Sequence, residues 1–291
     1  MNTGMSAVIL LALAAAVFIG LGLALTQMGV RHLSPLRGAC VSIPTTALFF
    51  LLLAPATVDF GAGEIRAAGL FALAGLLFPA AVTLMNYGAT RRIGPSMTGA
   101  LGNLAPLCAV LVAFVLLGER PQAGQLAAIA VILAGVALLF GNPFRHGAKS
   151  IDWAVSLPLL AALIRGIVQP VVKLGLAAWP NPFAATLLAY LVSACVLVSA
   201  GFLREGRKLY RFDGRGWLWF PLVGICNGLG LLLMYAALAK GPVAVVAPLA
   251  ACYPVPTMIF SRLLFAREPL APRVGLGVIV TVAGVVLLLV A

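Results

Sequence analysis

Apolar runs of about 20 residues, the length at which a helix spans the hydrocarbon core of a bilayer, recur along the whole chain. No other feature limits the possible folds as strongly, because in lipid a helix satisfies its own backbone hydrogen bonds. The composition agrees, since 63% of the residues are hydrophobic, 9% are charged, and the mean hydropathy is +1.14. A soluble domain needs more charge on its surface. We therefore expect an all-α integral membrane protein.

Ten transmembrane helices are predicted, joined mostly by short loops. Their expected ranges are 5–27, 36–55, 66–89, 95–117, 122–141, 153–178, 182–202, 216–239, 242–264 and 272–290. The loops are too short to hold a soluble domain, so we expect the function to lie within the membrane.

The second half of the chain repeats the first. Glu119 and Gly135 correspond to Glu268 and Gly284 at an offset of 149 residues. Each half holds five predicted spans. Because five is an odd number, the second half is expected upside down relative to the first, as two inverted five-helix repeats around a central cavity.

The polar segment between the halves sets the expected domain boundaries. The first repeat is predicted at 1–141, a linker loop at 142–152, and the second, inverted repeat at 153–291.

Orientation follows from the loop charges. Loops after the odd-numbered spans carry fourteen Lys and Arg residues, whereas those on the opposite side carry three. Basic loops stay in the cytoplasm. We therefore expect a multi-pass protein of the inner (plasma) membrane with both termini outside.

The sequence argues against several functional classes, through the motifs it lacks and the scattered positions of its basic residues. The net charge of +12 is spread over short loops, which does not suit a nucleic-acid partner. All five cysteines fall in apolar spans without CxxC spacing, so no metal site is predicted. No HExxH, P-loop or nucleophile elbow occurs. We expect no cofactor and no enzymatic activity.

The predicted sixth span holds the most informative polar residues. Arg165, Gln169 and Lys173 are spaced four apart and so share one helix face. Charges inside an apolar span cost free energy unless they face protein or water, and they mark functional sites by default. We predict that Arg165 or Lys173 binds the carboxylate of a solute. The alternatives are snorkelling of Lys173 to the interface and a bond from Arg165 to helix-end carbonyls.

Further polar side chains lie in spans that are expected to meet at the centre. They are Asn86, Tyr87, Asn103, Asn227, Tyr235 and Tyr253. Each alone is explained by an interhelical hydrogen bond. Together they suit a cavity with a few fixed hydrogen-bonding groups among apolar walls.

Prolines interrupt the inner spans. The hinge or helix-break candidates are Pro79, Pro106, Pro170, Pro248, Pro254 and Pro256. Proline removes a helical hydrogen bond, and such breaks are tolerated in a membrane where a neighbour or water satisfies the freed groups. A kink that only improves packing is the alternative for each of them.

Two matched segments carry a family resemblance. LLGERPQAGQLAAIAVILAGVALLF begins at Leu116, and LLFAREPLAPRVGLGVIVTVAGVVLLL begins at Leu263. Together with the Gly-Pro pairs that open spans four and nine, they resemble the EamA-type branch of the drug/metabolite transporter superfamily. The resemblance implies a basket of ten helices whose cavity is lined by spans 1, 3, 4, 6, 8 and 9. The length and short loops are similar to those of YddG-type exporters of amino acids.

These observations predict a carrier-type secondary transporter that exports small metabolites by alternating access. Amino acids, aromatic ones included, are the expected solutes, and a monomer in the lipid bilayer is the expected functional unit. None of the seven acidic residues lies in the middle of a span, so facilitated export is favoured over proton coupling. The alternatives are a multidrug or other metabolite exporter, proton-coupled or not, a membrane-embedded enzyme, and an assembly protein.

Overall fold

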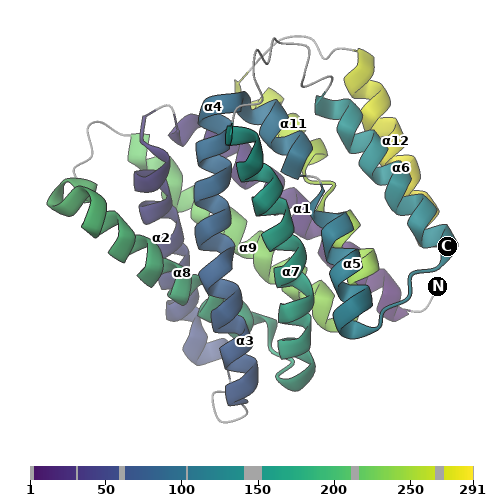
Figure 1. Ribbon diagram of the computed structural model, residues 1–291, viewed down its shortest axis with the longest axis horizontal. Helices are drawn as coiled ribbons and strands as arrows, with labels where there is room; N and C mark the ends of the chain where they lie inside the picture. The colour runs from purple at the N-terminus through teal and green to yellow at the C-terminus, as the bar shows by residue number, and fades with distance from the viewer. Residues whose placement is uncertain are drawn as a thin grey trace.

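The computed structural model is all-helical and describes residues 3–30, 32–58, 63–102, 104–140, 153–210, 216–265 and 272–290 (Figure 1). The α-helices in these ranges are α1 (Thr3–Gly29), α2 (Pro35–Thr57), α3 (Ile65–Gly75), α4 (Val82–Gly102), α5 (Ala105–Leu117), α6 (Ala123–Phe140), α7 (Ser156–Ala178), α8 (Pro182–Glu205), α9 (Trp219–Lys240), α10 (Val243–Ala250), α11 (Pro254–Phe265) and α12 (Pro272–Val290). The predicted all-α class is confirmed. The predicted linker at 142–152 lies outside the described residues.

Seven helical segments of the described chain are long and apolar enough to cross a membrane by length and composition. Shorter apolar helices cover Ala105–Leu117, Ala123–Leu138 and Gly275–Leu288. The chain is therefore a multi-pass membrane protein, and the count of ten spans stays a prediction.

Large apolar side chains cover the outside of the helix bundle. Leu52 is 73% exposed, Leu111 67% and Leu203 90%. A water-soluble monomer rarely exposes apolar surface on this scale. The exterior is thus suited to contact with lipid, while Tyr235, Phe50 and other large side chains fill the interior.

The helix boundaries of the third and fourth predicted spans differ from the sequence-based expectation. A loop was expected at 90–94, but α4 continues through these residues to Gly102. A proline removes only one helical hydrogen bond, so Pro95 does not have to end a helix. The chain is interrupted instead at Phe78, before α4, and α4 ends at Gly102, ahead of α5, which begins at Ala105.

The interruption before α4 is satisfied from a neighbouring helix. Phe78 has the extended backbone angles φ −143° and ψ 128°, directly before Pro79. Ser193 of α8 donates to the Gly75 carbonyl at 2.5 Å and accepts from the Ala80 amide at 3.3 Å. Its hydroxyl thus supplies partners to backbone groups on both sides of the break.

The interruptions before α5 and before α11 occupy corresponding positions in the two halves. In the first half, α5 begins at Ala105, one residue before Pro106. In the second, a turn at 251–253 separates α10 from α11, which begins at Pro254. Pro106 and Pro254 are 148 residues apart, close to the repeat offset.

The helix packing also relates the two halves, because a contact between them has a counterpart in which the halves are exchanged. α1 of the first half packs against α9 of the second, and α7 of the second packs against α4 of the first. α6 packs against α12 at one side of the bundle, and α2 packs against α8 toward the other (Figure 1).

Close contacts at glycine repeat this exchange at single residues. Gly135 on α6 lies against Thr281 on α12, and Gly284 on α12 lies against Ile132 on α6. Gly135 and Gly284 are 149 residues apart in the sequence, as are Ile132 and Thr281. The same contact is therefore made twice with the halves exchanged, which is the pattern of a two-fold interface.

Candidate functional site

Four buried side-chain atoms have no hydrogen-bond partner in the described part of the molecule. They are Asn86 Oδ1 on α4, Arg165 Nε and Gln169 Oε1 on α7, and Tyr235 Oη on α9. Leaving such an atom unpaired costs about 1–3 kcal/mol, and more for a charged group. Buried polar groups are normally satisfied, so four unpaired atoms call for an explanation. Binding of a polar ligand is such an explanation, because the ligand supplies the missing hydrogen-bond partners.

Arg165 occupies the middle of α7. The membrane-length segment runs from Trp153 to Ala178, and Arg165 lies near its midpoint. The side chain reaches α4, because its Nη2 atom is 3.0 Å from the position that a Cβ on Gly102 would take. The hydroxyl of Tyr253 lies 3.9 Å from the same position. Two of the predicted site residues, Arg165 and Tyr253, therefore meet beside Gly102.

Gln169 lies one helical turn beyond Arg165 on the same face of α7. It is 7% exposed, and Tyr235 on α9 is fully buried. Both α4 and α9 pack against α7, so α7 lies between the helices that carry the other two unpaired atoms.

Two other predicted site residues lie against the first two helices. The Tyr87 hydroxyl lies within reach of the Thr26 and Ser42 hydroxyls. The Asn227 amide lies against Gly22 of α1. Asn103 lies outside the described residues.

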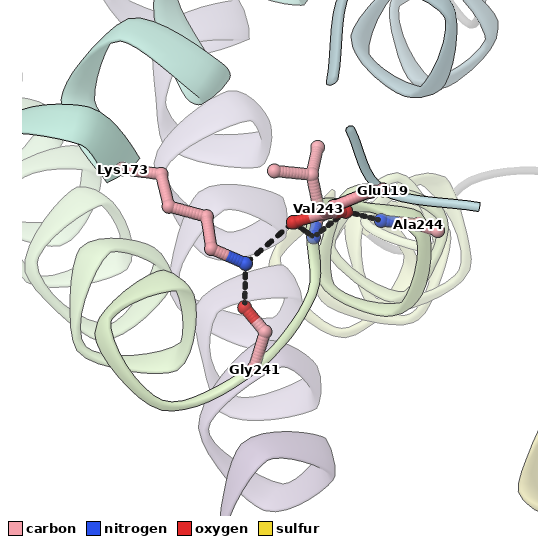
Figure 2. A network of polar contacts seen from close by, with 5 residues as sticks. All are labelled: Glu119, Lys173, Gly241, Val243 and Ala244. Carbon is pink, nitrogen blue, oxygen red and sulfur yellow. Dashed lines mark hydrogen bonds and ion pairs between the residues drawn. The ribbon is translucent and has the colours of Figure 1, made fainter. Parts of the chain in front are cut away.

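Lys173 already has a protein partner. Its ammonium donates to Glu119 Oε1 at 2.5 Å and to the Gly241 carbonyl at 2.7 Å (Figure 2). The side chain is only 25% exposed, so neither bond is a surface contact. Of the two cations that were predicted to bind a solute carboxylate, Arg165 is therefore the one with an unpaired atom, its Nε.

Glu119 of the first half contacts several residues of the second half. It follows α5 and accepts hydrogen bonds from the Val243 and Ala244 amides at the start of α10, at 2.9 and 3.4 Å (Figure 2). A signal for this contact was present in the sequence. The expected orientation puts both Glu119 and Lys173 at the outer side, where opposite charges in apolar surroundings attract strongly.

The proline candidates lie at helix interruptions or inside helices. Pro170 lies within α7 and Pro248 within α10. Pro256 lies in the first turn of α11 and against Gly20 of α1, where a Cβ would come within 2.9 Å of the proline ring. Pro79, Pro106 and Pro254 adjoin the interruptions described above.

Comparison with known proteins identifies the class to which this fold and site belong. The profile of the EamA-like transporter family matches the chain twice, at residues 6–141 and 152–290. The chain belongs to the EamA-like transporter family. It is accordingly a membrane transporter for small solutes, in agreement with the resemblance of the segments after Leu116 and Leu263.

The similarity to solved structures supports the fold. One chain, described only as "Crystal structure of protein", superposes with a TM-score of 0.76 over 97% of this chain and 96% of its own length. The sequence identity is 19%, so this likeness concerns the fold alone. No curated protein matches the sequence.

Proposed function

We propose that the protein is a carrier-type secondary transporter that exports small metabolites, most of all amino acids, across the inner membrane by alternating access. The observation that carries this proposal is the set of four unpaired buried atoms on α4, α7 and α9. In a transporter, a polar solute supplies the missing hydrogen bonds while it is bound, and the groups are left free when it departs.

The chemistry of these atoms suits a zwitterion. The Arg165 guanidinium forms a charge-assisted hydrogen bond to a carboxylate, about twice as strong as a neutral one. The amide oxygens of Asn86 and Gln169 accept hydrogen bonds from an ammonium group, and the Tyr235 hydroxyl serves either end.

The remaining candidates complete the proposed site. Tyr87 and Tyr253 offer aromatic faces to an apolar or aromatic side chain of the solute. Asn103 and Asn227 offer further hydrogen bonds that orient its polar groups.

Alternating access is proposed to arise from two inverted five-helix repeats at 1–141 and 153–291, joined by the linker at 142–152. The exchanged contacts of Gly135 and Gly284 support a two-fold relation between the halves. With an odd number of spans in each half, the axis lies in the membrane plane, and the basic loops favour both termini outside. We propose that the monomer suffices, because both repeats lie in one chain.

Amino acids are preferred to cationic drugs because of Arg165. A buried cation repels a cationic solute, and a drug-binding cavity would need acids or an aromatic cage. A YddG-like preference for aromatic amino acids is the narrower form of the proposal. A multidrug or other metabolite exporter remains the alternative, with or without proton coupling.

Counterflow of labelled amino acids in proteoliposomes tests the proposal. Wild-type protein should accumulate label, and Arg165→Ala should lower the rate at least about tenfold, the effect of losing one charge-assisted bond. Arg207→Ala, which removes an exposed cation from the turn after α8, is the matched control and should behave as wild type.

Counterflow by wild type that Arg165→Ala leaves unchanged would remove the proposed carboxylate site. Absence of counterflow for every amino acid would favour the multidrug or metabolite alternative. Transport that stops when only the proton gradient is collapsed would overturn facilitated export.

A further inference from the structure

A network of polar contacts between the halves lies at one end of the bundle. Glu119 belongs to the first half, and Lys173, Gly241 and Val243 belong to the second (Figure 2). The pair joins three segments: the turn after α5, helix α7, and the junction of α9 with α10. Any movement that separates α5 from α10 at this end must break these bonds.

Glu119 is held by backbone amides as well as by Lys173. Val243 and Ala244 begin α10, and their amides have no partner within that helix. A carboxylate at a helix N-terminus is also stabilised by the helix dipole. The Glu119 side chain is 15% exposed and Lys173 25%, so water screens the pair only in part. The contact is therefore specific, and water can still replace it when the segments part.

The pair lies at the end of the face that carries the candidate site. Lys173 is eight residues beyond Arg165, which places it about 12 Å along the α7 axis on the same side of the helix. Gln169 lies between them. A solute that moves along this face from Arg165 toward the end of α7 meets the Lys173–Glu119 pair.

The other half lacks this charge. Gly175 lies against Phe71, and Gly29 lies against Phe220, so the two glycines occupy corresponding positions. Lys173 and Gln27 each precede their glycine by two residues. Gln27 is neutral and makes a longer bond, from Nε2 to Ser261 Oγ at 3.4 Å. Of these two equivalent positions, the one on α7 carries a cation and the one on α1 a neutral amide.

We propose that the Lys173–Glu119 pair is a latch that closes one end of the transport path. This inference rests on the transporter function proposed above. An ion pair that holds only while this end is closed shifts the balance between the transporter's states toward closure at this end.

Distance measurements between two spin labels test the latch without any solute. Labels attached through an unnatural amino acid at Arg120 and Lys240, both exposed and next to the pair, leave the five native cysteines unchanged. The full-length protein is studied in lipid nanodiscs. Wild type should show mainly a short distance. Lys173→Gln, which gives this half the residue of the other half, should raise the ratio of long to short distances about tenfold.

Three variants sharpen the result. Glu119→Gln has nearly the same shape as the wild type and should open this end as Lys173→Gln does. Lys173→Arg keeps the charge and should retain the short distance. Arg66→Gln removes an exposed cation at the start of α3 and should leave the distribution unchanged.

The latch is overturned if Lys173→Gln and Glu119→Gln keep the wild-type distribution, or if Lys173→Arg opens this end as well. Should Lys173→Gln fail to fold, Glu119→Gln decides alone. Because the readout needs no solute, a failed amino-acid counterflow would overturn the proposed function and leave this result standing.

Discussion

The Arg165 guanidinium lies against Gly102, with Nη2 only 3.0 Å from the place of a Cβ on that glycine. A side chain at residue 102 must therefore displace the cation that is proposed to bind the solute. We expect Gly102→Val to lower amino-acid counterflow at least about tenfold, in line with the loss of one charge-assisted bond.

A matched control for this variant lies on the same helix. A Cβ on Gly88 would meet only Leu157, at an ordinary contact distance of 3.6 Å. Gly88→Ala should therefore transport as wild type does. Equal rates for Gly102→Val and wild type would show that the position of the guanidinium does not matter for transport.

The α6–α12 contact should be intolerant of larger side chains. A Cβ on Gly284 would lie 2.7 Å from the Ile132 backbone nitrogen, and backbone cannot move aside as a side-chain tip does. Overpacking of this kind costs about 1–3 kcal/mol, so Gly284→Val should lower the midpoint of thermal unfolding in detergent. Gly275→Ala on the same helix meets nothing within 4 Å and should leave the midpoint unchanged. The interface would be looser than described if both variants melted alike.

The hydroxyl of Ser193 should be important for stability. It is fully buried, and it pairs with backbone groups on both sides of the break at Phe78. Ser193→Ala leaves the Gly75 carbonyl and the Ala80 amide without this partner, which we expect to cost about 1–3 kcal/mol. Chemical unfolding of the two proteins in the same detergent measures the difference.

A hydroxyl bonded within its own helix is the control for Ser193. Thr57 donates to the Leu53 carbonyl at the exposed end of α2. Thr57→Ala should change stability by less than about 0.5 kcal/mol, as is usual for exposed substitutions. An equally small effect for Ser193→Ala would mean that other groups satisfy the break.

The ion pair between Arg37 and Glu205 should contribute little and should depend on salt. The two side chains join the start of α2 to the end of α8 at 2.6 Å, with exposures of 29% and 22%. Partly exposed pairs of this kind contribute about 0.2–1 kcal/mol. Glu205→Gln should lower the unfolding midpoint slightly at low ionic strength and less at 1 M salt, where the Debye length falls to about 3 Å. An effect that grows with salt would contradict an electrostatic origin.

Spacing alone could predict which face of α7 is polar. Arg165, Gln169 and Lys173 follow from a four-residue period, and an intramembrane cation is informative wherever it occurs. Two of these three side chains carry unpaired atoms in the structure. The repeat could be read from residue matches, and the all-helical class follows from span length.

The expected orientation places Glu119 and Lys173 on the same side of the membrane, but the sequence alone could not pair them. Glu119 lies 54 residues away, and their contact depends on how nearly uniform apolar helices rotate against each other. The end of α4 was misplaced for a different reason. Gly94-Pro95 is typical of a loop, but a helix tolerates one missing hydrogen bond, and α4 continues for seven residues beyond Pro95 to Gly102.

Tyr235→Phe separates a functional hydroxyl from a structural one. The Tyr235 side chain is fully buried on α9, and its hydroxyl has no hydrogen-bond partner among the described residues. Replacing an unsatisfied hydroxyl by hydrogen removes a desolvation cost. The free energy of unfolding should therefore rise by about 1 kcal/mol, and the variant should unfold at a higher temperature. The same change removes a group offered to the solute, so counterflow should fall several-fold. Ser193→Ala provides the contrast, because its bonded hydroxyl should lower stability when removed. If Tyr235→Phe lost stability and transported normally, the hydroxyl would be structural and would leave the proposed site.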